Sequence, residues 1–260
     1  MDEPLPGRSE RGSHRSAQHE GSPMSPVVST LRQRARAASA AELANIPWLG
    51  VLSVEHRALA SAALQVGSAE PGDRVCRTGA PSNFWFGVVD GLLKMSNVSL
   101  EGQQITYSGL PPGAWFGEGT LLKREVYRYN IEALRKSTVA GLPIEVFWQL
   151  LAHSIPFNRF VMMQLNERLG QFIAAREIDR NNQPDARVAR SLAALFHPVL
   201  YPGVGQVLRI TQQELAWLVG LSRQRVNEAL NALQAASLIR IEYGGLRVID
   251  LAALRNYQLG

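Results

Sequence analysis

The pattern of hydrophobic and polar positions divides the first half of the chain into three stretches. Residues 1–28 are dominated by Pro, Gly, Ser, Arg, His and Glu, a composition that cannot bury enough apolar surface to fold, so we expect a disordered tail. The spacing of residues 31–66 is helical, with an interruption at Pro47. From Ala69 to Leu142, short apolar or alternating runs are separated by turn residues. This texture predicts an all-β sandwich or barrel.

The turns of this β-region delimit its strands. Pro-Gly, Asp-Gly and Glu-Gly pairs mark turns along the region. The predicted strands are Phe84–Val89, Leu92–Val98, Gln104–Leu110 and Tyr129–Leu134. Helical spacing resumes at Ile144–His153, directly after the last apolar run.

A long helix is predicted from Phe157, just after Pro156, to about Arg180. One face carries an apolar stripe, formed by Val161, Leu165, Leu169 and Phe172. The stripe resembles a coiled-coil seam, so we expect part of the helix to pack on its own subunit and the central stripe to pair with a second copy. The alternative is that the whole stripe packs within one subunit. The run Asn181-Asn182-Gln183-Pro184 breaks the helix and predicts a domain boundary.

The most informative stretch lies between Thr211 and Leu230. Thr211, with Glu214 three residues later, has the form of a capping box that starts a short helix. Gly220 stands where the chain must turn, and Ser222 is suited to cap a second helix. The polar face of that second helix carries Arg223, Gln224, Asn227 and Glu228. This pattern is typical of a helix-turn-helix, whose second helix enters the major groove by its N-terminus.

Two β-branched runs after this motif predict a wing. Ile239–Tyr243 and Leu246–Ile249 flank a Gly-Gly pair, which is typical of a two-residue hairpin turn. Asp250 is expected to cap a last helix over Leu251–Tyr257. An ordinary helical hairpin is the alternative to a helix-turn-helix. The coincidence of capping box, turn glycine, serine cap and wing favours DNA binding.

Charge and composition agree with DNA binding and exclude several other classes of protein. The net charge is +5, and residues 185–260 hold eight arginines, which pair well with phosphate and guanine, against five acidic side chains. The single cysteine, Cys76, excludes a disulfide framework, a cysteine-rich zinc site and a four-thiolate iron–sulfur cluster. The histidines show no metal-ligand spacing. No window is apolar enough for a membrane span and no signal-peptide pattern is present, so we expect a cytoplasmic protein without a metal or catalytic site.

With these features the chain resembles the Crp/Fnr family of bacterial transcription regulators. The similarity covers nearly everything after the tail and is most specific over Thr211–Leu230, where Gly-Leu-Ser-Arg lies between the two helices. It implies an α+β protein with an N-terminal β-roll of the cyclic-nucleotide-binding, jelly-roll type, a long dimerisation helix and a C-terminal winged helix-turn-helix. The implied divisions are a tail (1–28), a β-roll sensor domain with flanking helices (29–154), a dimerisation helix and hinge (155–183) and a DNA-binding domain (184–260).

The resemblance also implies partners and the residues that contact them. The partners are a palindromic double-stranded operator, a second copy of the chain as a homodimer, and RNA polymerase, with no membrane. The residues expected to read bases are Arg223, Gln224 and Glu228, with Asn227 on the same face. The residues expected to contact phosphates are Thr211, Gln213, Ser222 and Arg225. The best-known members carry an acid at Gln224 and an arginine at Glu228. Because glutamine favours adenine and glutamate accepts from cytosine, we expect the operator to differ from the usual half-site.

An effector site in the β-roll is implied by the same resemblance. Phe116-Gly117-Glu118-Gly119 matches the start of the family's cyclic-nucleotide cassette, in which glycine and arginine hold the cyclic phosphate and glutamate holds the ribose. The arginine matches Arg128, but Tyr129 replaces the phosphate-binding Ser or Thr that follows it. The candidate effector residues are Gly117, Glu118, Arg128 and Tyr129. The candidate ligand is a cyclic nucleotide (cyclic AMP or cyclic GMP), and Tyr129, Phe172 and Ile173 weigh against cyclic AMP.

Three alternatives stay open beside an effector-controlled regulator. The pocket can be vestigial, with Glu118 and Arg128 paired to each other. A cupin-type enzyme shares the β-roll but needs a His/Glu metal cluster inside the barrel, and residues 69–142 contain no histidine. A nucleotide-gated regulatory subunit binds a protein partner and has no use for residues 222–229. We therefore favour a regulator that swings its DNA-binding domains about residues 181–184 when the packing of its long helices changes.

Overall fold

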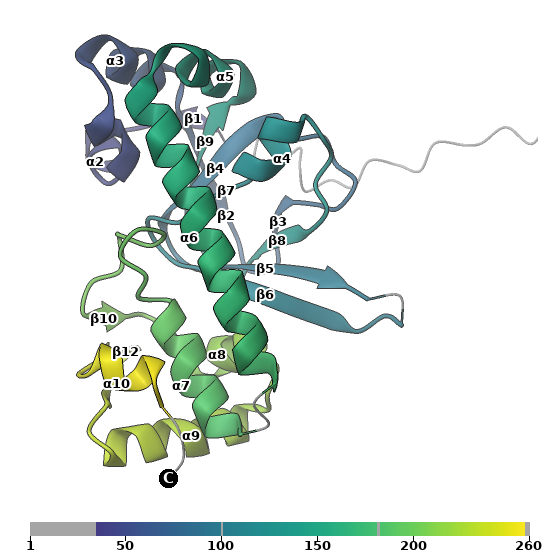
Figure 1. Cartoon of the computed structure of the whole chain (residues 1–260), viewed down its shortest axis with the longest axis vertical. Helices are drawn as coiled ribbons and strands as arrows, with labels where there is room; N and C mark the ends of the chain where they lie inside the picture. Colours follow the sequence, from purple (N-terminus) through teal and green to yellow (C-terminus); the bar gives the residue numbers. More distant parts are fainter. Residues whose placement is uncertain (1–34, 100, 181–182, 258–260) are drawn as a thin grey trace, which may run out of the picture.

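The computed structural model describes residues 35–99, 101–180 and 183–257. Figure 1 shows an N-terminal β-rich region and a smaller C-terminal region, both packed along one long helix, α6 (Ile155–Arg180). The predicted tail 1–28 and residues 181–182 of the predicted hinge lie outside the described residues.

The N-terminal region is a β-roll made of two antiparallel sheets. The first has the order β1-β2-β9-β4-β7: β1 (Arg36–Ala37), β2 (Gln65–Ala69), β9 (Ser137–Pro143), β4 (Phe84–Asp90) and β7 (Trp115–Phe116). The second has the order β3-β8-β5-β6: β3 (Arg74–Cys76), β8 (Asn130–Ala133), β5 (Leu93–Val98) and β6 (Gln104–Leu110). The four predicted strands are confirmed to within one residue at each end. The pattern does not reveal β2 and β9, because Gly, Ser and Ala interrupt their alternation.

Apolar side chains from both sheets fill the interior of the roll. Val75, Leu93, Ile131 and Val139 are buried there together with the Cys76 thiol. Leu200 and Tyr201, from the C-terminal region, join the same cluster. The roll therefore shares part of its core with the region that follows α6.

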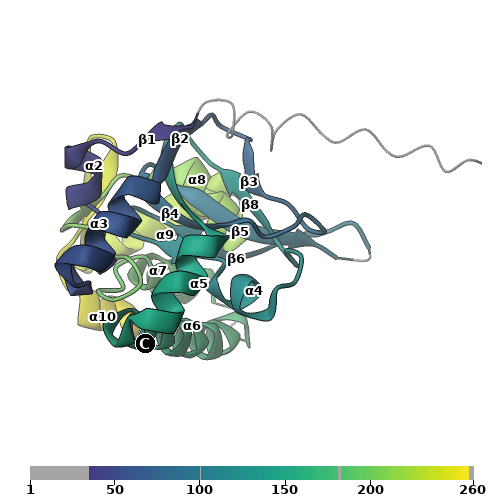
Figure 2. The ribbon, with the colours of Figure 1, turned by 90° about the horizontal axis from the view of Figure 1, so that it is seen from above.

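Short helices cover one side of the roll. They are α2 (Ala40–Ala44), the 3-10 helix η1 (Pro47–Val51), α3 (Val54–Ala63) and α5 (Ile144–His153), with α4 (Glu118–Lys123) after β7. Figure 2 shows α2 and α3 on the side away from the projecting β5–β6 hairpin. The helical prediction for 31–66 is wrong at Arg36 and Ala37, which form β1 and pair with β2, and at its end, because Gln65 and Val66 already pair with β9.

An aromatic cluster joins these helices to α6. Trp48 of η1 and Trp85 of β4 are fully buried, with ring centroids 5.3 Å apart. Phe157 of α6 packs edge-on against Trp48, at 5.5 Å. Burial of such large rings is a major source of stability, so the first turns of α6 are anchored to the β-roll.

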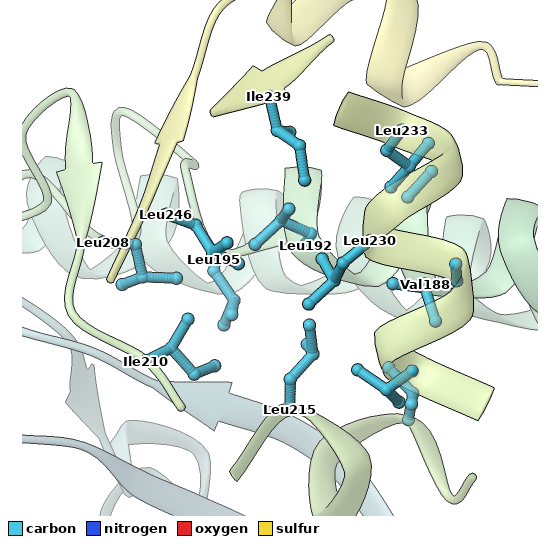
Figure 3. Packing of buried hydrophobic residues seen from close by; sticks show 14 of the residues in the cluster. Val188, Leu192, Leu195, Leu208, Ile210, Leu215, Leu230, Leu233, Ile239 and Leu246 are labelled. Atoms are coloured by element: carbon cyan, nitrogen blue, oxygen red, sulfur yellow. The ribbon is translucent and has the colours of Figure 1, made fainter. Parts of the chain in front are cut away.

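The C-terminal region is a winged helix-turn-helix. Its elements are α7 (Pro184–Ala194), β10 (Val207–Leu208), α8 (Gln212–Val219), α9 (Arg223–Ala235), β11 (Ile239–Glu242), β12 (Gly245–Val248) and α10 (Leu251–Arg255), and its sheet has the order β10-β12-β11. Figure 3 shows Val188, Leu192, Leu215 and Leu230 pointing toward one another in its core. The predicted helices and wing hairpin are confirmed, with α10 two residues shorter than expected. The predicted Gly244-Gly245 turn is wrong by one residue, because Glu242 pairs with Gly245 and the two-residue turn is Tyr243-Gly244.

The C-terminal region is docked on the β-roll of its own chain. Arg135, between β8 and β9, donates from Nε and Nη2 to the two carboxylate oxygens of Glu214 on α8, at 2.8 and 2.7 Å. Thr106 of β6 donates to the Trp217 carbonyl at 3.1 Å. A Cβ at Gly109 would lie 2.8 Å from a Leu195 methyl and 2.9 Å from a Leu218 methyl. α8 therefore approaches β6 closely at this position, and a larger residue here would have to displace the two leucine methyls.

Candidate DNA interface and effector site

Local sequence sets the angle between α8 and α9. The Thr211 hydroxyl accepts from the Glu214 N–H at 3.1 Å, and the Glu214 carboxylate accepts from the Thr211 N–H at 2.7 Å. Gly220 ends α8 with φ at +67°, a conformation that glycine adopts without strain. The Ser222 hydroxyl caps α9 by accepting from the Arg225 N–H at 3.2 Å. The predicted capping box, turn glycine and serine cap are confirmed.

The exposed face of α9 carries the predicted base-reading residues. Arg223, Gln224 and Glu228 are exposed and Asn227 is half-buried, whereas Val226 and Leu230 are buried on the opposite face. Gln224 Nε2 donates to Glu228 Oε1 at 3.3 Å, which leaves the Gln224 amide oxygen as an acceptor. Asn227 Oδ1 accepts from Gln212 Nε2 at 2.7 Å. The face thus presents one arginine, the side-chain amides of Gln224 and Asn227, and the carboxylate of Glu228.

Arg225 is half-buried and is held by two carboxylates. Its Nη1 lies 2.9 Å from Glu228 Oε2, and its Nη2 lies 2.7 Å from Asp185 Oδ1 at the start of α7. The family resemblance implies a phosphate contact for Arg225, and its partner Asp185 was not predicted, because a contact across 40 residues leaves no local signal. Arg225 therefore orients Glu228, and Asp185 ties this arrangement to the chain just after α6.

The remaining predicted phosphate contacts lie around the same edge. Thr211 and Ser222 are exposed and Gln213 is half-buried. The wing hairpin stands beside them, with Gly244 at φ +73° in its turn and a fully exposed Tyr243 at its tip. These groups lie near the start of α9 and in the wing, where hydroxyl and amide side chains are exposed or half-exposed.

A cavity of about 830 Å³ lies beside the predicted effector residues. Gly117, Glu118, Arg128 and Tyr129 all line it, so the structure brings the four predicted residues together. Side chains from α6, β6 and the DNA-binding domain complete its wall, including Phe172, Tyr107, Arg187 and Leu218. Its size is in the range of pockets that hold drug-sized ligands.

Glu118 is paired with α6 rather than with Arg128. Arg168 Nε lies 3.0 Å from Glu118 Oε1, and Arg168 Nη2 donates to the Trp115 carbonyl at 2.6 Å. Both charged side chains are buried. Burial opposes the charge of Arg168, but Glu118 beside it outweighs this and raises the pKa of the guanidinium. The second carboxylate oxygen of Glu118 is buried without a partner among the described residues, so it is available to a hydroxyl or N–H of a ligand.

Arg128 and Tyr129 occupy the rim and wall of the cavity. Arg128 is exposed and lies 3.0 Å from Glu125. Burial raises the pKa of the Tyr129 phenol, and its hydroxyl is hydrogen-bonded to Thr120, so it stays neutral at physiological pH and faces α4. The alternative in which Glu118 and Arg128 pair with each other is therefore wrong for this conformation.

The outer face of α6 carries an exposed apolar stripe. Met162, Leu169, Phe172 and Ile173 are all exposed on this face. Val161, predicted to lie at a dimer interface, is only 2% exposed and packs against Phe157 and its neighbours. Leu165 is half-buried against the same cluster. One face of α6 therefore packs within the chain and the opposite face is exposed, as predicted. Val161, however, lies on the packed face and not on the exposed one.

Three further observations on the described ranges concern a metal site, a membrane span and the cysteine. They contain no group of three or more His, Cys, Asp or Glu side chains placed to hold a metal ion. None of their helices combines the length and apolarity that a membrane crossing requires. Burial raises the pKa of the Cys76 thiol, which keeps it protonated and unreactive.

Two family models match the chain, one before α6 and one after it. The model of the cyclic nucleotide-binding domain matches residues 67–154. The model of the Crp-like helix-turn-helix domain matches residues 186–257. The two matches coincide with the β-roll and the winged region.

Curated relatives and solved structures combine both modules. The chain is 29% identical to transcriptional regulator SdrP of Thermus thermophilus, over 73% of this chain and 92% of that protein. It is 28% identical to the cyclic AMP receptor protein of the same organism, over 66% of this chain and 78% of that protein. The fold is similar to that of FixK2 from Bradyrhizobium japonicum, with a TM-score of 0.61, 14% identity, and coverage of 76% of this chain and 98% of FixK2.

Proposed function

Because the chain belongs to the Crp/Fnr family of transcription regulators, we propose that it is a homodimer that binds a specific palindromic operator and is controlled by a small ligand in its β-roll. The observation that carries the proposal is the exposed face of α9, whose N-terminal turn presents Arg223 and Gln224 beside a capped helix start. A DNA partner implies action in the cytoplasm. RNA polymerase is the proposed protein partner on the operator.

Base reading is assigned to the N-terminal half of α9. Arg223 is exposed and suited to guanine O6 and N7. The free amide oxygen of Gln224 accepts from adenine N6 or cytosine N4, since its amide nitrogen already donates to Glu228. Asn227 and Glu228 complete the reading face, and Thr211, Gln213, Ser222 and Arg225 position it on phosphates.

Dimerisation is assigned to the exposed stripe of α6. Met162, Leu169, Phe172 and Ile173 expose a continuous apolar face on a surface helix, which is unfavourable in water unless a partner covers it. A second copy carries the same stripe, and a two-fold axis through it pairs helix with helix. The two recognition helices then reach half-sites about one helical turn apart.

Effector binding is assigned to the cavity beside Glu118. A ligand hydroxyl can donate to the unpartnered Glu118 oxygen, while Arg128 at the rim pairs with a phosphate. Cyclic AMP and cyclic GMP are candidates of this kind. Because α6 lines the cavity through Arg168 and Phe172, a bound ligand changes the packing of the dimer helices and shifts the population of DNA-binding conformations.

A second candidate is a regulator that needs no effector. Arg168 already neutralises Glu118 within the chain, as expected of a pocket that keeps its architecture without a ligand. In that case the docked arrangement of the two regions is itself competent to bind DNA.

Selection of bound duplexes from a random DNA pool, with and without cyclic nucleotides, tests both candidates. We expect an inverted repeat with half-sites about one helical turn apart. Enrichment only with a nucleotide supports the first candidate, and equal enrichment without one supports the second. A pool that shows no enriched sequence under either condition contradicts both.

A further inference from the structure

A turn in the loop after α7 fills part of the β-roll. Leu200 and Tyr201 belong to the C-terminal region, yet both are buried in the cluster inside the roll. A Cβ on Gly203 would lie 2.7 Å from the carbonyl carbon of Pro112, so the same loop lies directly against the backbone of the roll. Residues 197–203 thus form a plug, and the DNA-binding domain leaves the roll only if this plug is withdrawn.

Polar side chains of α6 and β6 hold the plug in place. Gln164 Nε2 donates to the Val199 carbonyl at 3.0 Å. The Tyr201 hydroxyl donates to Gln171 Oε1 at 3.1 Å and lies at the same distance from the Ser108 hydroxyl. Gln164 and Gln171 are about two helical turns apart, on one face of α6. The plug is therefore fixed both to the long helix and to the roll.

The conformation of the plug depends on the imidazole of His197. Its Nδ1 accepts from the N–H groups of Val199 and Leu200, at 3.3 and 3.2 Å. A serine or aspartate side chain has the same role at a helix N-cap. The Tyr201 N–H donates to the His197 carbonyl at 2.8 Å and closes the turn. Because Nδ1 accepts these hydrogen bonds, it carries no proton in this arrangement.

The other ring nitrogen of His197 faces a carboxylate. Nε2 lies 3.2 Å from Oε2 of Glu167 on α6, so the neutral ring donates from Nε2 to this side chain. The cations that act on the ring are Arg255 of α10 and Arg168 of α6. His197, Glu167 and Arg255 line one cavity, and the other polar side chains in its wall are Tyr107, Ser108, Gln171, Arg190, Ser191 and Asn256.

These surroundings favour the neutral ring. Burial opposes a charge on the imidazole, and Arg255 and Arg168 act in the same direction, whereas Glu167 favours the charge; together they lower the pKa of His197. A lowered pKa means that the docked plug binds a proton less readily than a released one, whose ring is in water. The stabilisation is therefore complete above about pH 6.5, the ordinary value for histidine, and is lost as the pH falls through the lowered pKa.

We infer that His197 is a proton-sensitive switch, which holds the plug in the β-roll when neutral and loosens the DNA-binding domain when its Nδ1 takes a proton from solvent. That proton turns an acceptor into a donor, which then faces the N–H groups of Val199 and Leu200, so both hydrogen bonds are lost. The inference goes beyond the proposed function. It concerns the docking of the two regions, with or without a ligand beside Glu118.

Hydrogen–deuterium exchange of the full chain between about pH 8 and about pH 5 tests the inference. After correction for the intrinsic exchange rate at each pH, we expect the protection of amides 199–201 to fall at least about three-fold in acid. His197→Asn keeps an acceptor for the turn but does not titrate, so its protection should stay constant. His153→Asn, at an exposed position on α5, is the matched control and should behave as the wild type.

Two charge variants test whether the ring itself titrates. Glu167→Gln removes the carboxylate that favours the charged ring and should move the midpoint to lower pH, whereas Arg255→Gln should move it to higher pH. Wild-type protection that does not change with pH overturns the inference, as does a fall in His197→Asn equal to that of the wild type. If His197→Asn is unprotected at every pH, the charge variants decide: opposite shifts support the switch, and any other result overturns it.

Discussion

Arg168 brings together two elements that are far apart in the sequence. Its guanidinium neutralises Glu118 at the start of α4 and also holds the Trp115 carbonyl, so one side chain supports both the cavity beside Glu118 and the aromatic cluster. The pair is buried, and a buried charge without its partner is costly.

Replacing Arg168 with methionine should therefore destabilise the protein. We expect a loss of about 3–5 kcal/mol in the free energy of unfolding, measured with urea, because Glu118 is left charged and buried. The double variant Arg168→Met/Glu118→Gln should recover most of that loss. If the single variant costs less than about 1 kcal/mol, the pair does not have the structural role assigned to it.

The sequence identified the residues of the cavity but not their pairing. Gly117, Glu118, Arg128 and Tyr129 follow one another closely enough to match a local pattern, and all four line the cavity. Arg168 lies 50 residues from Glu118, and only the packing of α6 on the roll brings it there. Periodicity can place a residue on one face of a helix, but it cannot identify the side chain that this face contacts in the folded protein.

Replacing Arg223 with alanine should abolish the specific footprint on the operator. The side chain is exposed and points from the first turn of α9, so its loss removes base contacts worth about 1–3 kcal/mol in each half-site. Asn231→Ala, exposed two turns farther along α9, is the control and should leave the footprint in place. Sedimentation should show an unchanged dimer for both variants. An unaltered footprint for Arg223→Ala would move base reading away from this turn.

At the scale of elements, α6 has one face that packs on the β-roll and another that is exposed. Phe157 and Val161 anchor it to the β-roll, while Leu169 and Ile173 remain exposed. Each residue advances the direction around the helix by about 100°, so these sets fall on different faces.

A charge in the exposed stripe should separate the protomers. Leu169 is 59% exposed, so Leu169→Glu leaves the monomer folded and places two carboxylates against each other in the dimer. Analytical ultracentrifugation should report a monomer. Met163→Glu, which is exposed on another face of α6, should remain dimeric. A dimer that persists in Leu169→Glu places the interface elsewhere.

Sequence periodicity predicted those elements whose side chains alternate or repeat strongly. The helix-turn-helix was placed almost residue by residue, because Thr211, Gly220 and Ser222 each have a local conformational reason to be there. Strands β2 and β9 were missed, because Gly67 and Gly141 interrupt their pattern and their partners lie far along the chain. Their pairing depends on the closed roll rather than on local preference.

At the scale of the whole molecule, the docking of the DNA-binding domain rests on a few polar contacts. The ion pair of Arg135 with Glu214 is bidentate and largely shielded from water. Glu214 also completes the capping box of α8, so the pair connects the β-roll to the start of the helix-turn-helix.

Breaking this pair should loosen the docked arrangement. Arg135→Gln removes charge-assisted hydrogen bonds of roughly 1.5–3 kcal/mol, which favours conformations with the domains apart. Small-angle X-ray scattering should show a larger radius of gyration for Arg135→Gln than for the wild type. The neighbouring variant Lys136→Gln, at an exposed side chain, should match the wild type. Identical scattering curves for all three proteins would show that the apolar contacts at Gly109 suffice for docking.

The central claim is that α9 reads a specific DNA sequence. The most direct measurement is competition binding of the full chain to a labelled operator taken from the random pool, against unlabelled operator and unrelated duplex at one salt concentration. We predict that the operator competes at least about a thousand-fold better than unrelated DNA. This ratio is at the lower end of the ratios of specific to non-specific affinity that sequence-specific DNA-binding proteins show. Equal competition by the two duplexes, at low salt and with each nucleotide present, would contradict the account.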